Sequence, residues 1–393
     1  MVRFVWSKVT VLLLTIWFWT YWIPYYVILK DSIYNTRVSD FFIFYKVGAL
    51  WAAHANPYIS LSRFIYPPAS LPFFGVFALF NFEVAAQLWT LTYLSLFVTA
   101  LLALAIAVKG ERRLILVSIA VLLLLTSYPL LIVMQLSQID LLIASLTILS
   151  LVMERMKHKV ASAALLSVGV LLKGSAVFLL IYFVIFRRDK RFLGYFLVSM
   201  LAIVGASLLV VPVQLYWYWV VSVAPTMYSV FDWPESQSLV HLFWLAGFGK
   251  AALQFVSLSG IGLFTLFSFY AGQNRWKNNL RGNTICADAM FLLNGLIILL
   301  LSPFSLIYSY VWVILPLALF LSSLLVEDVK LAYLALVGFA SCFLNSSLGI
   351  SVLSFLIYPM TLPTFLIGNL MMILSIIPIC LRPNVILRHS KSS

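Results

Sequence analysis

Long apolar runs separated by short polar connectors extend along all 393 residues of this chain. The first run is Val9 to Leu29, and runs of comparable length recur through the rest of the sequence. A helical run of this length crosses a hydrocarbon core of about 30 Å. We therefore predict an all-α polytopic membrane protein, in which residues 1–393 form a single domain of about 11–13 transmembrane helices.

Composition agrees, because 64% of the residues are hydrophobic, only 9% are charged, and the mean hydropathy is +1.08. The net charge of +13 does not indicate nucleic-acid binding, since the basic residues gather in short connectors. That is the pattern of cytoplasmic loops, so we predict cytoplasmic N- and C-termini in a bacterial inner or plasma membrane. The clusters are Lys109, Arg112 and Arg113; Arg155, Lys157 and Lys159; Arg187, Arg188, Lys190 and Arg191; Arg275, Lys277 and Arg281; and Arg382, Arg388 and Lys391.

The remaining polar segments become outer loops, of which the largest are a first outer loop at 30–67 and a long outer loop at 213–249. Shorter outer turns are expected at 135–140, 173–174, 302–305 and 349–363. The run from 68 to 108 presents a parity problem, because one or two membrane crossings there would place the following connector on opposite sides. If 68–82 and 84–108 both span, Lys109 to Arg113 lies outside; either 68–82 fails to cross, or the charge rule breaks here.

Residues 41–53, FFIFYKVGALWAA, are too few to span the bilayer but read as a helix. Phe41, Phe44, Tyr45, Gly48 and Trp51 fall on one face of that helix. We predict an interfacial helix in the first outer loop, lying on the outer surface of the membrane.

Few carboxylates are available for chemistry on the outer side. Of the twelve in the chain, we assign six to inner connectors, Asp288 and Glu154 among them, and Glu83 lies in the turn at 82–84 whose side is open. Asp40 precedes the interfacial helix, where it is either a catalytic base or an ordinary helix N-cap. Asp140 is either the polar end of a helix or, with Gln138, a headgroup ligand. The outer carboxylates are Asp31, Asp40, Asp140, Asp232 and Glu235.

Lys173 lies between two apolar half-helices, and an ionisable group inside a membrane is costly enough to suggest a function. The competing interpretation is a lysine that extends its ammonium to the interface. The three cysteines have no paired spacing, and His54 and His241 are not spaced as metal ligands. We therefore expect no metal and no cofactor.

Short motifs follow one another in order across roughly residues 35–320. They are Ser39-Asp40-Phe41, Gly48-Ala49, Asn56-Pro57-Tyr58, Tyr66-Pro67-Pro68 followed by Trp89, Leu136-Ser137-Gln138-Ile139-Asp140, Leu172-Lys173 followed by Arg187-Arg188, Gln237-Ser238-Leu239, and Leu301-Ser302-Pro303-Phe304-Ser305. No motif is specific alone, but the ordered set resembles glycosyltransferase family 87, polytopic enzymes of the GT-C fold. Ser137 stands where that family has glycine. Tyr308 and Ser309 stand where mannosyl-transferring members often carry histidines.

The resemblance implies a hexosyl donor, mannosyl-like, carried on polyprenyl phosphate, an active site on the outer side, and an aspartate base that matches Asp40. The acceptor would be a glycolipid or glycan. In the mechanism we expect, Lys173, Arg63 and Lys46 bind the donor phosphate and Asp40 activates the acceptor with inversion. Candidates for binding sugar or acceptor are Tyr66, Gln138, Asp140, Gln237, Ser238, His54 and Tyr308.

Two rival functions remain open at this point. Broken segments near 173–174 and 359–363 would also suit a transporter or flippase for lipids or lipid-linked sugars. Against it, no inverted halves match, and the candidate charges gather at one face. A polymerase acting on lipid-linked glycan would be expected to have an outer loop rich in arginine and histidine. The stretch 213–249 offers only His241.

Overall fold

The computed structural model describes residues 40–61, 64–227, 236–277, 284–302, 305–326, 333, 337 and 364–381. Within these ranges every regular element is a helix, and two segments meet only in an isolated antiparallel bridge between Ser236 and Leu306. The predicted all-α polytopic class is thereby confirmed. The predicted first membrane helix, Val9–Leu29, and the turn at 349–363 lie outside the described residues.

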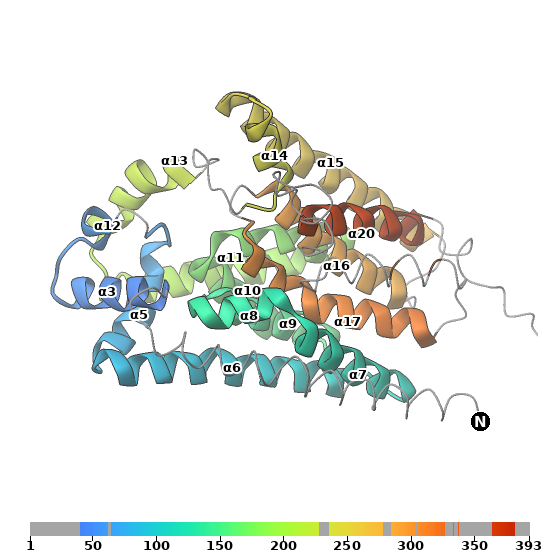
Figure 1. The fold of residues 1–393 in the computed structure, drawn as a ribbon, viewed down its shortest axis with the longest axis horizontal. Helices are drawn as coiled ribbons and strands as arrows, with labels where there is room; N and C mark the ends of the chain where they lie inside the picture. Colours follow the sequence, from blue (N-terminus) through green and yellow to red (C-terminus); the bar gives the residue numbers. More distant parts are fainter. Residues whose placement is uncertain are drawn as a thin grey trace, which may run out of the picture.

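The helices run largely along the long axis of the molecule (Figure 1). In chain order the elements are α3 Asp40–Ala52, α4 Pro57–Ser60, η3 Pro68–Ser70, α5 Leu71–Ala78, α6 Phe82–Ala107, α7 Glu111–Thr126, α8 Tyr128–Leu136, α9 Asp140–Arg155, α10 Lys159–Leu172, η4 Gly174–Leu179, η5 Ile181–Phe186, α11 Lys190–Ser207, α12 Val213–Tyr218, η6 Trp219–Val223, α13 Ala224–Met227, α14 Leu239–Leu245, α15 Lys250–Lys277, α16 Thr284–Leu301, η8 Ile307–Tyr310, α17 Val311–Val326 and α20 Thr364–Leu381. The long outer loop predicted at 213–249 thus contains several short helices.

Short polar side chains set where several helices begin. Asn56, Asn81, Ser127, Asp189 and Ser238 each accept a hydrogen bond from a backbone N–H in the first turn that follows them. Such N-caps are each worth about 1 kcal/mol, because they satisfy a donor that the helix itself leaves unpaired. They therefore fix the breaks between long apolar runs that periodicity alone would leave continuous.

α9 is the central helix, since every residue from Asp140 to Val152 is buried. α6, α10 and α17 pack around it. A helix that is largely apolar on all sides, as α9 is from Leu141 to Val152, is stable only where neighbours cover the whole circumference. α9 carries Asp140 at one end and Arg155 at the other, so it connects two charged clusters at opposite ends of the bundle.

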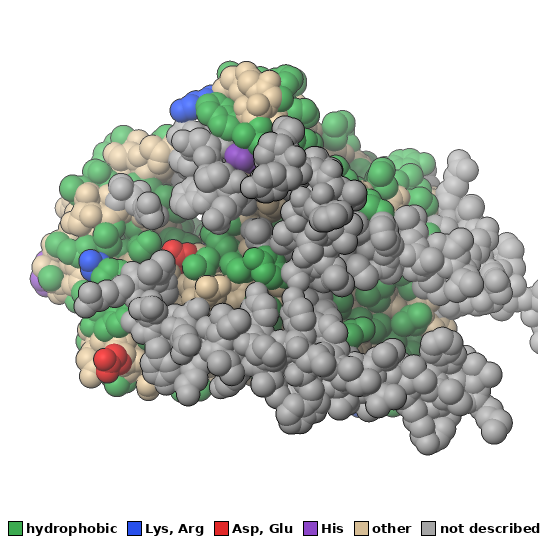
Figure 2. Space-filling model, viewed as in Figure 1, with side chains coloured by type: hydrophobic (Ala, Val, Ile, Leu, Met, Phe, Trp, Pro, Cys, Tyr) green, Lys and Arg blue, Asp and Glu red, His purple; other side chains and the backbone are tan. Residues whose placement is uncertain are grey.

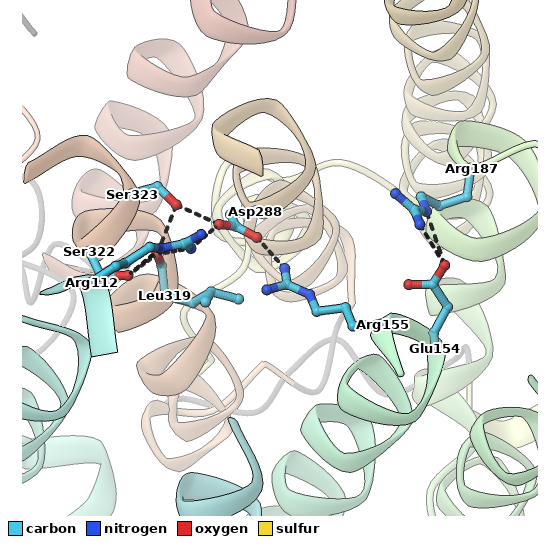
Figure 3. Close-up of polar contacts among 8 residues, drawn as sticks. All are labelled: Arg112, Glu154, Arg155, Arg187, Asp288, Leu319, Ser322 and Ser323. Carbon is cyan, nitrogen blue, oxygen red and sulfur yellow. Dashed lines mark hydrogen bonds and ion pairs between the residues drawn. The ribbon is translucent and has the colours of Figure 1, made fainter. Parts of the chain in front are cut away.

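The first cluster contains Asp140 and Lys173, and we call it the Asp140 end. The second, the Asp288 end, centres on a fully buried aspartate of α16 that forms ion pairs with Arg112 and Arg155. Ser323 donates to the same carboxylate at 2.5 Å (Figure 3). The assignment of Asp288 to a polar connector is wrong, because α16 already begins at Thr284 and packs the aspartate against α7, α9 and α17.

The shortness of α5 favours the first of the two solutions for the run between 68 and 108, in which 68–82 does not cross. This eight-residue helix packs along α3 and is too short to cross a bilayer, whereas α6 has 26 residues and is long enough to span alone. Lys109 and Arg112 consequently reach the Asp288 end, where they line one cavity with Arg155 and Arg187. The basic connectors gather at one end, as the positive-inside pattern requires.

Five helices among the described residues are long and apolar enough to cross a membrane, or six if the bent pair α7 and α8 counts as one span. On α6 the exposed side chains Leu91, Val98, Leu102 and Ile106 recur every four or seven residues and form one lipid-facing stripe. Figure 2 shows a face whose described surface is largely hydrophobic, with few charged side chains. The expected total of about 11–13 helices stays a prediction.

The helix expected over 41–53 is present as α3, and it buries Phe41, Phe44, Val47 and Gly48. Gly48 and Gly75 of α5 allow the two helices to approach closely. A Cβ added to Gly48 would lie 2.4 Å from the Phe74 carbonyl oxygen. Small residues at such contacts are typical of helix pairs in membranes. The predicted position of α3 at the membrane surface remains an expectation.

We expect Gly48→Ala to push α3 away from α5 and to lower the free energy of unfolding by roughly 1–3 kcal/mol. The added methyl would meet backbone atoms, which cannot rotate aside. Gly194→Ala in α11 is the matched control, because a Cβ there meets nothing within 4 Å. Thermal unfolding in detergent would compare the two, and equal melting temperatures for both variants would contradict the close packing of α3 on α5.

Candidate active site

An ion pair between Asp140 and Lys173 forms the centre of the Asp140 end. α9 begins at Asp140, and α10 ends at Leu172 with Lys173 in an extended conformation as its C-cap. The Lys173 ammonium contacts both carboxylate oxygens, at 2.7 Å and 2.9 Å. Asp140 is fully buried and the Lys173 side chain is 19% exposed. The interpretation of Lys173 as a lysine extended into the interface therefore does not describe its contacts.

Two aromatic rings border the same ammonium. Its nitrogen lies 5.8 Å from the ring centroid of Tyr308 and 5.7 Å from that of Trp312. Both rings come from the chain that enters α17, so a third segment joins α9 and α10 at this point. An ammonium has three N–H donors, of which Asp140 takes two. One N–H donor therefore remains for another acceptor.

Tyr66 connects this ion pair to Asp40. Burial raises the pKa of the Tyr66 phenol well above its usual value, and the charges of Asp140, Tyr308 and Asp40 raise it further. The phenol therefore stays protonated, with an O–H that can donate to a ligand. Asp40 is the first residue of α3 and only partly buried. Because its charge contributes to the raised pKa of Tyr66, the Asp40 carboxylate lies on the side of α3 that faces this phenol.

Aromatic packing holds α3 in place against the site. Phe41, next to Asp40, stacks on Trp89 of α6 with centroids 5.4 Å apart, and the Trp89 indole donates to the Ser137 carbonyl at 2.9 Å. Ser137 ends α8 in the left-handed conformation, at φ 52°. Glycine adopts that conformation without a Cβ penalty, so Ser137 occupies a backbone position that favours glycine.

The motif that begins at Gln237 and the one that ends at Ser305 lie side by side. The Gln237 N–H donates to the Ser305 carbonyl at 2.7 Å, and the Tyr310 hydroxyl donates to the Gln237 carbonyl at 3.2 Å. Several side-chain atoms in this region are buried and have no hydrogen-bond partner among the described residues. They are Gln237 Oε1, Ser305 Oγ, Ser309 Oγ and Trp312 Nε1. Unsatisfied buried groups are costly, so these atoms are suited to bind polar groups of a ligand.

The structure brings together five of the residues that the sequence singled out: Asp40, Tyr66, Asp140, Lys173 and Tyr308. Gln138 is buried two residues before Asp140. Of the other candidates, Lys46 is exposed with its ammonium over the Phe42 ring, His54 is exposed in the turn after α3, and Ser238 caps α14. Arg63 lies outside the described residues.

Trp312 is the residue that sequence reasoning missed. It lies near the start of an apolar run, where a tryptophan normally indicates packing, and its distance from Lys173 and its unsatisfied indole N–H distinguish it. The pairing of Asp140 with Lys173 was also missed, because the residues are 33 positions apart and no local pattern links them. Among the described residues, no three His, Cys, Asp or Glu side chains are grouped so as to hold a metal ion.

These features define a polytopic α-helical membrane protein with a charged, aromatic-lined site at one end of its bundle. The model of glycosyltransferase family 87 matches residues 64–303, and the chain belongs to that family. It is therefore a membrane glycosyltransferase. The match begins after Asp40 and α3, so that part of the site rests on the structure and the sequence motifs. No curated protein matches the chain.

Proposed function

We propose that the protein transfers a hexosyl residue, mannosyl-like, from a polyprenyl-phosphate donor to a glycolipid or glycan acceptor on the outer side of the membrane. The observation that carries the proposal is the convergence of Asp40 with Tyr66, Asp140 and Lys173. Within a glycosyltransferase, a carboxylate and a lysine in one site supply the two charges that the reaction requires. The basic connectors at the opposite end support the outer location.

Asp40 is the better candidate for the general base than Asp140. Both oxygens of Asp140 accept hydrogen bonds from Lys173, and its side chain is fully buried. A carboxylate engaged in this way has little capacity left to accept a proton. Asp40 is partly exposed at the start of α3, so an acceptor hydroxyl can approach it.

Lys173 is suited to the donor phosphate, and Asp140 would be the residue that positions it. A fixed cation stabilises charge as it develops on a leaving group, and it costs no rearrangement during the reaction. The Lys173 ammonium is held by Asp140 and bordered by Tyr308 and Trp312. Those rings limit the direction from which an anion can approach the remaining N–H.

In the proposed step the acceptor oxygen attacks the anomeric carbon, its proton passes to Asp40, and the carbon–oxygen bond to phosphate breaks. The polyprenyl phosphate leaves with the bonding electrons, beside Lys173. Attack from the face opposite the phosphate inverts the anomeric centre. One base is sufficient for this reaction, so no second carboxylate is needed as a nucleophile.

The test is sugar transfer by the purified protein in proteoliposomes, offered a panel of polyprenyl-phosphate sugars and, in parallel, nucleotide sugars. We expect transfer from one lipid-linked donor, and that donor identifies the sugar. Transfer from a nucleotide sugar alone would contradict the proposed donor class. Absence of transfer from every donor by a protein that unfolds cooperatively would contradict the proposed reaction.

The transporter alternative has lost support. The chain does break at Lys173, where α10 gives way to the short 3₁₀ segment η4, but the lysine there is held by an ion pair. The second break, at 359–363, lies outside the described residues. Membership of a glycosyltransferase family favours catalysis over transport.

A further inference from the structure

A cavity of about 390 Å³ opens at the Asp288 end, far from the Asp40 site along α9. Five cationic side chains line it: Lys109, Arg112, Arg155, Arg187 and Arg275. The carboxylates among its lining residues are Glu154 and Asp288, so positive charge predominates in the cavity. The proposed glycosyl transfer at the Asp140 end makes no use of this cavity.

Carboxylates fix three of the four arginines that line the cavity. Arg112 and Arg155 share Asp288, and the Arg187 guanidinium donates twice to Glu154 Oε1, at 2.7 Å and 3.2 Å (Figure 3). The side chains of the three arginines are between 14% and 29% exposed. Arg155 uses one of its five N–H donors on Asp288, so most of its donors remain for another acceptor.

The chemistry of this cavity favours a phosphate group. Guanidinium groups in fixed positions bind phosphate oxygens with several directed hydrogen bonds, and an excess of cations compensates the negative charge. Glu154 Oε2 is buried and has no hydrogen-bond partner among the described residues. A hydroxyl on the ligand would satisfy that oxygen, as the glycerol hydroxyl of a phospholipid headgroup does.

The surroundings of the cavity favour a lipid as the source of the phosphate. The exposed apolar stripe of α6 includes Leu102 and Ile106 and ends directly at Lys109. On α15, Leu266, Phe269 and Tyr270 are exposed just before Arg275. Acyl chains lying along either helix would place a headgroup at the cavity, and basic pockets between membrane helices are known to bind anionic lipids.

We propose that the Asp288 end holds a binding site for the phosphate group of an anionic phospholipid. It would be a structural lipid, separate from donor and acceptor. The proposal does not depend on the identity of the transferred sugar, and it holds even if the proposed glycosyl transfer is wrong.

The test measures binding of phosphatidylglycerol to the detergent-solubilised protein by native mass spectrometry. Lys109→Gln/Arg275→Gln removes two cavity cations without touching the ion pairs of Asp288. Lys190→Gln/Arg191→Gln is the matched control, because both residues are exposed and neither lines the cavity. Lys109→Gln alone changes only an exposed side chain and serves if the double variant does not fold. We expect roughly tenfold weaker binding for the cavity variant and little change for the control.

Further binding measurements with other ligands distinguish the possible sources of the phosphate group. Phosphatidylcholine should not saturate the site, and inorganic phosphate should compete with phosphatidylglycerol only weakly. If inorganic phosphate saturated the cavity as well as phosphatidylglycerol does, its ligand would be a soluble phosphate and not a lipid. Undiminished lipid binding in the cavity variant would overturn the proposal. An equal loss of binding in the control would also overturn it, because the lipid would then be attracted by the basic surface as a whole and not by the cavity.

Discussion

Asp40→Asn is expected to lower the rate of sugar transfer by about 10²- to 10⁴-fold, the usual contribution of a positioned general base. The substitution keeps the size of the side chain, and asparagine is as good at a helix N-terminus as aspartate. α3 should therefore still begin at residue 40 and pack on Trp89 through Phe41. The measurement is the initial rate of transfer in proteoliposomes, with melting temperature recorded in parallel.

Glu83→Gln is the matched control for this experiment. Glu83 is an exposed carboxylate in the first turn of α6, near the segment against which α3 packs. Neutralising it should leave the rate of transfer unchanged. A rate that survives in Asp40→Asn would return Asp40 to the role of a helix-end residue, and Asp140 would then be the carboxylate to examine.

Asp140→Asn is expected to destabilise the fold by about 3–5 kcal/mol, because it leaves the Lys173 ammonium partly buried without its counter-charge. Lys173→Met should be comparably harmful, since it leaves a fully buried carboxylate unpaired. Thermal unfolding in detergent measures both effects. Either variant will also lose transfer, so neither alone separates stability from catalysis.

The double variant Asp140→Asn/Lys173→Met makes that separation. With both charges removed, no unpaired ion remains, and much of the stability lost in each single variant should return. Transfer should not return, because the cation proposed for the donor phosphate is gone. Recovery of both stability and transfer would show that the pair serves only the fold. A double variant less stable than either single one would contradict the ion pair itself.

The sequence predicted what depends on local pattern. Apolar runs indicated the membrane class and the aromatic face of 41–53 indicated α3, whereas the charge rule left the side of Lys109 and its neighbours open. The polar residues at chain breaks, such as Asp140 and Lys173, also stood out. In each case the signal lies within one turn or one run of the chain.

What could not be predicted depends on contacts between distant segments. Asp288 looked like a connector residue because it follows basic positions closely, and only the packing of α7, α9 and α17 reveals it as a buried centre of ion pairs. Trp312 is one aromatic residue among many in apolar runs. Pairing between Asp140 and Lys173 required the end of α10 to be placed beside the start of α9.

The length of α9 has a consequence for where the two charged clusters lie. Its 16 residues extend roughly 22 Å, less than the hydrocarbon thickness of about 30 Å. The charges at its two ends are therefore closer together than the two headgroup layers of an undisturbed membrane. Because neighbouring helices bury α9, lipid does not have to match its length, whereas α6, with 26 residues, presents an apolar stripe of its own. The short central helix thus sets the depth at which the two charged clusters lie inside the protein, while longer outer helices set the match to the bilayer.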